Sequence, residues 1–442
     1  MRTTLYLFLL ISLVFTAQGQ KIKNQKKSLI PYLNSITAKD LKTHLLVVAS
    51  DEMEGRETGS AGQKKAGNYL IAHYQNNTIP FPTGAQSYYQ PVPASFLNAK
   101  RNENLPDSEN IWAFIKGSEK PDEIVVISAH YDHVGVKNGE VYNGADDDGS
   151  GTVALLEIAQ AFQLAQAAGQ GPKRSILILH VTGEEHGLHG SRYYSENPLC
   201  PLANTVADVN IDMIGRRDEK HANSNDYIYL IGSDYLSSDL HAICEKANAD
   251  YVHTNIDYTF NDKNDPNRFY YRSDHYNFAK HNIPSVFLFN GVHADYHQAS
   301  DEVDKIEFDA LAKRTQLAFA IAWEIANRKE KLKVDKIWLT NVDCFASSSK
   351  ALGCWFLIFD LDFLRTFSYP IYYHLSSRKS VYSWLKADSW KLSAKTKKAP
   401  RKLGAFEILG GWPGSNRRPA APQTTTLTNW ATTTIFTSAN VL

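Results

Sequence analysis

Histidine and acidic residues follow several apolar runs of the chain at the point where each run ends. Such groups after a buried segment are typical of metal ligands, because a buried carboxylate needs a cation or hydrogen-bond donors to stay charged. Imidazole and carboxylate ligands without thiolate favour zinc in a catalytic role, with one position open for water. The groups are His130 and Asp132 after the run 123–129, Asp147 in the loop that comes next, Glu184 and Glu185 after 175–181, Asp212 after 206–211, and His297 after 284–289.

Taken singly, each of these groups has a simpler structural interpretation. A His-x-Asp pair is usually hydrogen-bonded, aspartates before Gly-Ser-Gly usually cap a helix, and a Glu-Glu pair after a strand usually lies in a solvated loop. Together at one edge of a sheet, however, they would concentrate negative charge, which is unfavourable without cations. Two divalent metal ions that share a carboxylate would neutralise this charge, and they could activate a water and polarise a carbonyl together.

The elements that must position these groups alternate between strand and helix. This alternation predicts an α/β fold, a mostly parallel mixed β-sheet sandwiched by helices, with the metal site at the carboxyl ends of the strands. The predicted strands are 87–91 (at an edge), 110–115, 123–129, 175–181, 206–211, 227–231 and 284–289. The predicted helices are 37–50, 61–74, 152–168, 191–197, 237–248 and 308–328.

The first 19 residues have the pattern of a signal peptide. Arg2 precedes an apolar core at 5–15, and small residues precede a cut after Gly19. The core is too short to span a membrane comfortably. We therefore expect export to the periplasm or the extracellular space, no stable membrane insertion, a polar lead-in at 20–36, and one α/β domain at 37–336.

Residues 337–442 differ in composition from the rest. They hold 13 Lys and Arg against 5 Asp and Glu, and six of the eight tryptophans. Without strand–helix alternation or a motif, they are interpreted as a basic, Trp-rich tail that need not be a native domain. The formal net charge of the whole chain is zero, which argues against nucleic acid as a partner. Cys200 and Cys244 could pair in an exported protein.

Five motifs, in this order, closely resemble peptidase family M28, the co-catalytic zinc peptidases. The resemblance covers roughly residues 35 to 335, includes the loop 51–60 and the segment 273–276, and implies a zinc-exopeptidase fold that is phosphorylase/hydrolase-like. The motifs are Ala129-His-Tyr-Asp-His133, Asn143-Gly-Ala-Asp-Asp-Asp-Gly-Ser-Gly151, Glu184-Glu-His-Gly-Leu-His-Gly-Ser191, Asn210-Ile-Asp-Met-Ile-Gly215, and Asp295-Tyr-His297 with Asp301 and Asp304-Lys-Ile306.

Matched position by position, the resemblance implies two zinc ions per chain and a role for each group. Asp147 would bridge the two ions, whereas Asp146 and Asp148 do not match the bridging position. One ion would be held by His130 and Asp212, and the other by Glu185 and His297.

The same resemblance implies an aminopeptidase-type exopeptidase that hydrolyses N-terminal residues of peptides with a metal-bridging hydroxide. Asp132 would orient His130. Glu184 would be the general base, and Tyr296 would steady the tetrahedral oxyanion. The surplus histidines are interpreted as wall or structural residues: His133, His186, His189, His275 and His293.

Other functions stay open. A glutaminyl cyclase-like acyltransferase would use the same fold with one zinc ion, but every ligand position is filled here. A non-catalytic binding ectodomain would tend to lose a ligand or the base, and none is missing. Dipeptidase and carboxypeptidase activity also stay open. We expect residues 216–225 and 255–272 to line the substrate pocket, and the sequence does not give the shape of that pocket. The segment 61–110 is too short for a protease-associated insert domain.

Overall fold

The computed structural model describes residues 29–100 and 103–336, and within them a mixed eight-stranded sheet organises the chain. The strand order is β1-β2-β6-β3-β7-β10-β8-β9. The strands of this sheet are β1 (Tyr89–Val92), β2 (Ser108–Ile115), β3 (Lys120–His130), β6 (Arg174–Val181), β7 (Thr205–Ile211), β8 (Tyr227–Ile231), β9 (Asn255–Asp257) and β10 (Ser285–Phe289). A separate hairpin joins β4 (Val136–Lys137) to β5 (Glu140–Val141).

Four central strands, β6, β3, β7 and β10, run parallel to their neighbours within this group. Their carboxyl ends therefore meet at one edge, where open α/β sheets bind ligands. β2 and β8 flank the group as antiparallel strands. The predicted mostly parallel mixed sheet is thus confirmed, and the four strands that the acidic and histidine groups follow are these central ones.

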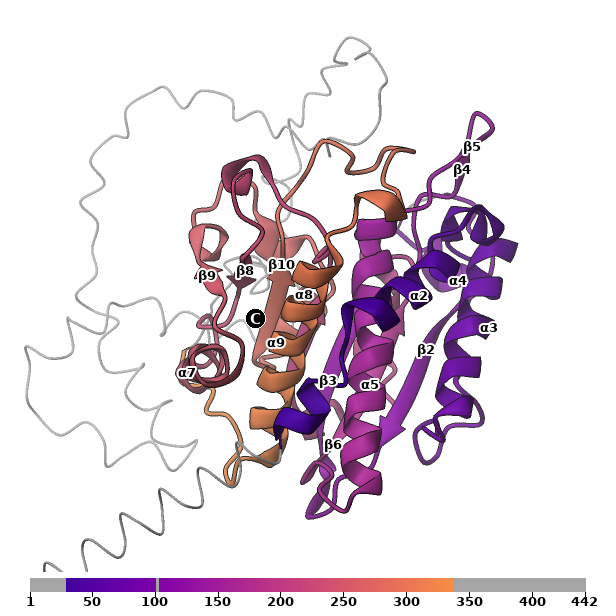
Figure 1. Cartoon of the computed structure of the whole chain (residues 1–442). Coiled ribbons are helices and arrows are strands. Elements are labelled where there is room, and N and C mark those ends of the chain that lie inside the picture. The colour runs from indigo at the N-terminus through magenta and orange to yellow at the C-terminus, as the bar shows by residue number, and fades with distance from the viewer. Residues whose placement is uncertain (1–28, 101–102, 337–442) are drawn as a thin grey trace, which may run out of the picture. The chain divides into compact units, whose positions relative to one another are not determined.

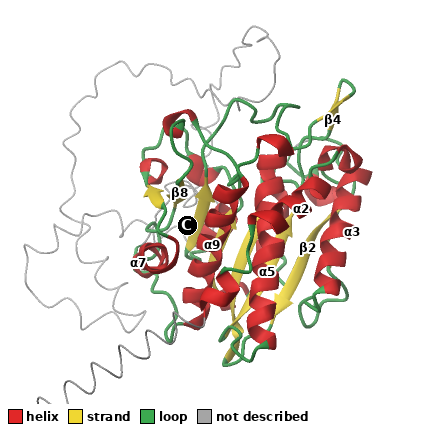
Figure 2. Cartoon of the chain, viewed as in Figure 1, coloured by secondary structure: helices red, strands yellow, loops and turns green. Residues whose placement is uncertain are grey.

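Both faces of the sheet are covered by packed elements, and β3 is accordingly apolar on both sides. Val125 and Ile127 enter the main core, which α5 and α9 complete, whereas Ile124 and Val126 enter a second core on the opposite face. Figures 1 and 2 show α2, α3, α5 and α9 in front of the strands. The helices are α2 (Ala38–Val48), α3 (Ala61–Asn76), α4 (Ala94–Leu97), α5 (Gly151–Ala167), α6 (His189–Glu196), α7 (Ser238–Ala247), α8 (His275–Ala279) and α9 (Phe308–Asn327).

The structure departs from the sequence prediction at the lead-in. Residues 29–33 are helical, and Leu29, Leu33 and Ile36 are buried in the main core. The prediction of a polar lead-in is therefore wrong from residue 29 onward, because apolar residues at near-helical spacing are masked there by a Lys- and Gln-rich composition. Thr37 then caps α2 by accepting a hydrogen bond from the Asp40 amide.

Three other predictions concern the two ends of the chain, membrane insertion and the cysteines. The predicted signal peptide (1–19) and basic tail (337–442) lie outside the described residues. In the part of the chain that is described, no helix is long and apolar enough to cross a membrane. The same part contains Cys200 and Cys244, and both are free thiols, so the pairing considered above is not made.

Candidate metal centre

Asp147 lies between two groups of side chains, and each of its carboxylate oxygens faces a different group. Its Oδ1 is 3.3 Å from Nε2 of His130, which ends β3. Its Oδ2 is 3.0 Å from Nε2 of His297, in the loop after β10. Asp147 is buried. One carboxylate thus faces two clusters at the carboxyl edge of the sheet.

The first cluster contains His130 and Asp212, which come from the adjacent strands β3 and β7. Nε2 of His130 lies 3.6 Å from Oδ1 of Asp212, and Ser273 donates a hydrogen bond of 2.7 Å to Oδ2 of Asp212. Asp148 also approaches, so that His130, Asp148 and Asp212 could together hold a metal ion. Oδ1 of Asp148, however, already accepts the backbone amides of Gly151 and Met213 at 2.8 and 3.1 Å.

The second cluster contains Glu185 and His297, and it includes a residue that the sequence prediction left out. Oε2 of Glu185 is 3.1 Å from Nε2 of His297. Oε1 of Glu185 is 2.8 Å from Nδ1 of His133. His133, Asp147 and Glu185 form another group able to hold a metal ion. The interpretation of His133 as a wall residue therefore needs revision, and its position in the His-Tyr-Asp-His motif was the available signal.

The other surplus histidines lie outside both clusters. His186 pairs with Glu103, His293 lies 3.1 Å from Oδ2 of Asp146, and His275 stacks on Phe287. These contacts agree with structural roles.

A buried network fixes the loop that carries Asp147. The Asp301 carboxylate accepts the backbone amides of Asp146 and Asp147 at 3.0 and 3.1 Å. Asp146 in turn accepts the Gly215 amide at 2.6 Å. The guanidinium of Arg56, fully buried, donates to four backbone carbonyls, two of them in this loop, at Asn143 and Gly144. The aspartate loop is therefore held by backbone contacts on several sides, which sequence reasoning did not foresee.

Glu184 follows β6 and lines the same pocket as Asp147 and Asp212. Burial, together with the nearby carboxylates of Asp212 and Asp274, raises the pKa of Glu184 well above its ordinary value, against the opposing effect of His130. The Glu184 amide donates to Oδ1 of Asp132 at 3.3 Å. Thr58, from the loop after α2, donates to Oδ2 of the same aspartate at 2.9 Å. Asp132 thus supports the backbone of Glu184.

The cluster residues have opposing charges, and their pKa values reflect this. Although burial opposes the shift, the close imidazoles of His130 and His297 hold the pKa of Asp147 well below its usual range. Burial is likewise outweighed at His297, whose pKa Asp147 and Glu185 raise to about 10. The cluster is therefore a site where carboxylates stay ionised only with cations beside them.

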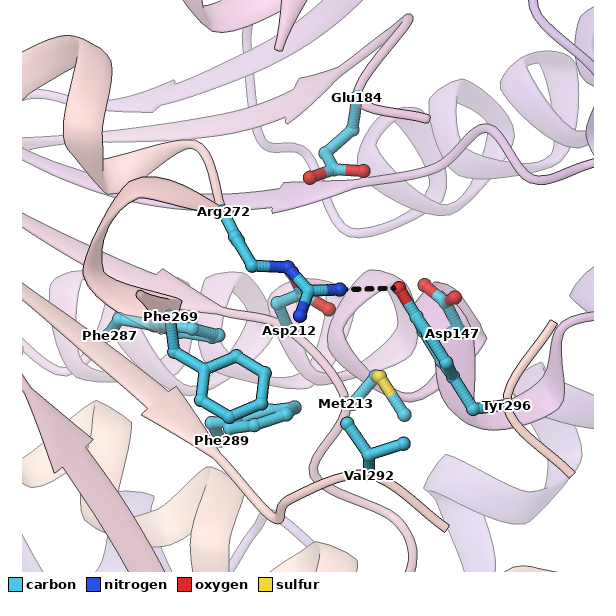
Figure 3. A pocket seen from close by; sticks show the side chains of 10 residues that line it. All are labelled: Asp147, Glu184, Asp212, Met213, Phe269, Arg272, Phe287, Phe289, Val292 and Tyr296. Atoms are coloured by element: carbon cyan, nitrogen blue, oxygen red, sulfur yellow. Dashed lines mark hydrogen bonds between the residues drawn. The ribbon is translucent and has the colours of Figure 1, made fainter. Parts of the chain in front are cut away.

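A pocket opens beside the clusters (Figure 3). Arg272 reaches across it to Tyr296, and its Nη2 donates to the tyrosine hydroxyl at 3.4 Å. The Tyr296 ring stacks on His297 with ring centroids 3.9 Å apart. The wall of the pocket away from the carboxylates is formed by apolar side chains, which are Met213, Phe269, Phe287, Phe289 and Val292.

The pocket corrects one sequence expectation. Phe269 and Arg272 belong to the predicted segment 255–272, but residues 216–225 do not line this pocket. Arg216 and its neighbours line an adjacent groove instead, which shares Val292 with the pocket. The missed wall comes from β10 and from Met213, two residues after β7, because the ends of central strands face the site.

The residues of both clusters fit divalent metal ions. Among the described residues, Oδ2 of Asp147, Oε1 of Glu185 and both ring nitrogens of His133 are buried without a hydrogen-bond partner. Buried polar atoms normally have such partners, and a ligand to a metal ion does not need one. Imidazole and carboxylate donors without thiolate suit zinc.

Comparison with known proteins gives the chain its family. The model of Peptidase family M28 matches residues 110–322, which include every cluster residue described above. Residues 110–322 belong to peptidase family M28. The predicted resemblance is confirmed.

Curated relatives of this chain include two fungal proteins. Leucine aminopeptidase 1 of Penicillium rubens is 26% identical over 218 residues, which are 46% of this chain and 53% of the relative. A probable leucine aminopeptidase of Trichophyton verrucosum is 29% identical over 289 residues, 60% of this chain and 74% of the relative. The chain thus spans about half the length of the Penicillium protein.

A solved structure shares the fold. BSAP, a zinc aminopeptidase from Bacillus subtilis, superposes with a TM-score of 0.51 over 69% of this chain and 97% of its own, at 17% identity. The predicted zinc-exopeptidase fold is confirmed by this likeness.

Proposed function

We propose that the chain is an aminopeptidase that uses two zinc ions to hydrolyse N-terminal residues of peptides. The observation that carries the proposal is the position of Asp147, with one oxygen facing His130 and the other facing His297. A carboxylate in this position can bridge two ions.

The proposed ligands divide between the two clusters. His130 and Asp212 would hold one ion with Oδ1 of Asp147, and Glu185 and His297 would hold the other with Oδ2 of Asp147. When bound, the zinc ions lower the pKa of water and polarise the scissile carbonyl. The remaining steps belong to side chains of the protein.

Glu184 would act as the general base. Its carboxylate would take a proton from the attacking water and pass it to the leaving amine. Two hydrogen bonds to Asp132, from the Glu184 amide and from Thr58, support its position.

Tyr296 would donate its hydroxyl proton to the oxyanion that forms on the scissile carbonyl. Because Arg272 already donates to the tyrosine oxygen, the phenolic proton is free to point elsewhere. The guanidinium would also add positive charge near the developing oxyanion.

An aminopeptidase is favoured over the alternatives by two features. The relatives in the comparison are leucine aminopeptidases by name. The apolar pocket beside the carboxylates could take an apolar first side chain, while Glu184 and Asp212 offer negative charge to a free amine. A glutaminyl cyclase would need only one ion, and two clusters are present.

A substrate panel tests this proposal. Purified full chain should cleave leucyl and phenylalanyl amides, leave N-acetylated versions intact, and lose activity with a chelator. Cleavage of the blocked substrates would reject an aminopeptidase, and indifference to the chelator would reject metal catalysis. Cyclisation of a Gln-initiated peptide without hydrolysis would favour the cyclase alternative.

We also propose export, on the signal-peptide pattern of residues 1–19. Amino-terminal sequencing of the secreted protein should begin at Gln20. A retained, uncut amino terminus would contradict it.

A further inference from the structure

His133 is a buried imidazole without a conventional partner. Its side chain has 0% exposure, and within the described residues neither ring nitrogen has a hydrogen-bond partner. Leaving a polar group unpaired in the interior costs free energy, so such a group in a native protein calls for an explanation. The nearest acidic atoms, on Glu185 and Asp147, indicate what the ring faces.

The distances around His133 place its Nδ1 close to two carboxylates. Nδ1 of His133 lies 2.8 Å from Oε1 of Glu185 and 3.8 Å from Oδ2 of Asp147. Although the first distance is short, the pair does not form a hydrogen bond. Ligands of a tetrahedral zinc ion are about 3.3 Å apart, and each aims its lone pair at the ion instead of at its neighbour.

A second imidazole approaches the same space from another loop. Nε2 of His297 lies 3.0 Å from Oδ2 of Asp147 and 3.1 Å from Oε2 of Glu185. The rings of His133 and His297 are 5.8 Å apart by centroid and inclined at 66°. Two imidazoles therefore approach the same two carboxylates, and together the four side chains offer the number of ligands that zinc prefers.

The backbone fixes His133 in this position. The His133 amide donates to the carbonyl of Arg56 at 3.1 Å. Gly144, with φ +53°, lies against the ring, and a Cβ there would stand 2.5 Å from two ring carbons. The absence of a side chain at Gly144 thus makes room for the imidazole, and the ring has no space to withdraw in that direction.

We propose that Nδ1 of His133 is a fourth protein ligand of the second zinc ion, beside Asp147, Glu185 and His297. This inference rests on the proposed two-zinc function. It makes the two ions unequal. The second ion would have four protein ligands, whereas the ion at His130, Asp147 and Asp212 would have three and more room for water or substrate.

X-ray absorption at the zinc edge tests the ligand directly. The full chain, saturated with zinc, is compared with His133→Ala and with the control His253→Asn, an exposed histidine far from the site. Because three imidazoles would become two, the imidazole scattering per zinc should fall by about a third in His133→Ala and stay constant in the control. An unchanged imidazole signal in His133→Ala at full zinc occupancy would overturn the proposal.

Zinc affinity provides a second readout. In competition with a chromophoric chelator, His133→Ala should keep one tight site and lose more than about 100-fold in affinity at the other, beyond the usual effect of a residue that only supports a ligand. A loss below about 10-fold would overturn the proposal. Matching circular dichroism of the metal-free proteins shows that the variant folds.

The outcomes separate this inference from the proposed function. If the wild type binds two zinc ions and cleaves peptides, and His133→Ala loses no ligand, only the inference about His133 is rejected. If His133→Ala loses an imidazole ligand but the wild type cleaves no free-amine substrate, only the aminopeptidase proposal is rejected.

Discussion

The carboxylate of Asp132 lies 3.8 Å from Nδ1 of His130, whereas the backbone carbonyl of Asp132 lies 3.0 Å from that nitrogen. The ring of His130 is therefore oriented by backbone, and the Asp132 carboxylate is left to accept hydrogen bonds from Thr58 and the Glu184 amide. This differs from the orienting role that the family resemblance implies for the Asp132 side chain.

Asp132→Ala should consequently impair catalysis more than zinc binding. Removal of the carboxylate leaves the Glu184 amide unsupported, so kcat should fall about 10- to 100-fold. Zinc affinity should change much less, because the carbonyl that contacts His130 remains. Steady-state kinetics and zinc titration on the same preparation measure both. An equal loss in affinity and kcat would restore the conventional role of Asp132.

Glu184→Gln should abolish turnover while metal content persists. The amide cannot accept the proton from water, so the rate should fall at least about 100-fold. Elemental analysis and peptide hydrolysis are the measurements, with Glu196→Gln on the exposed end of α6 as the control. Residual activity above a few per cent would mean that another group is the base.

Tyr296→Phe should lower kcat about 100- to 1000-fold with little change in KM, because the hydroxyl is needed only for the oxyanion. Tyr258→Phe removes a hydroxyl outside the pocket, where it donates to Glu245, and should leave kcat unchanged. A rise in KM alone in Tyr296→Phe would instead assign the hydroxyl to substrate binding.

The sequence was informative wherever one physical pattern dominated a segment. The continuous apolar run at 175–181 predicts a strand buried on both faces, and β6 occupies residues 174–181. The carboxyl ends of parallel strands meet at one edge, so groups as distant in sequence as His130 and His297 could be expected together. β9, in contrast, is a three-residue edge strand, too short for a periodic signal.

Atomic detail within the site was beyond the sequence. The motif Asp146 to Asp148 does not reveal that the Asp148 carboxylate accepts the Gly151 amide, or that the Asp301 carboxylate accepts the Asp147 amide. Both hydrogen bonds depend on the direction in which the backbone amide points. Similarly, the spacing of His133 and His130 does not reveal that their rings face different clusters.

Asp301→Ala should loosen the aspartate loop. Two buried amides would lose their acceptor, at a cost of about 1.5–3 kcal/mol for each charged hydrogen bond. Zinc affinity should fall about 10- to 100-fold. Chelator competition and thermal unfolding measure the two effects, and the exposed Asp304→Ala is the matched control. Unchanged affinity would show that the loop keeps its shape without Asp301.

His180 should make the fold sensitive to mild acid. Burial, with a smaller effect of His73, lowers the pKa of His180 to about 3, and its Nε2 contacts the Tyr74 hydroxyl at 2.5 Å. The unfolded chain takes up this proton near pH 6.5, whereas the folded protein does not. Stability is therefore full above pH 6.5 and declines as the pH falls, by about 2 kcal/mol at pH 5 from this residue.

Urea unfolding at pH 7 and pH 5 checks this expectation. His180→Gln cannot titrate, so its stability should depend less on pH than that of the wild type. Equal pH dependence in the two proteins would contradict the prediction.

The place of β10 in the sheet has a consequence for synthesis of the chain. The last described strand, Ser285–Phe289, inserts between β7 and β8, which precede it by more than 50 residues. Until the ribosome has released β10, both of those strands lack a partner on that side, and unpaired strand edges invite aggregation. Nascent chains halted before residue 285 should therefore depend on chaperones. The sheet of the domain is completed only when β10 has been translated.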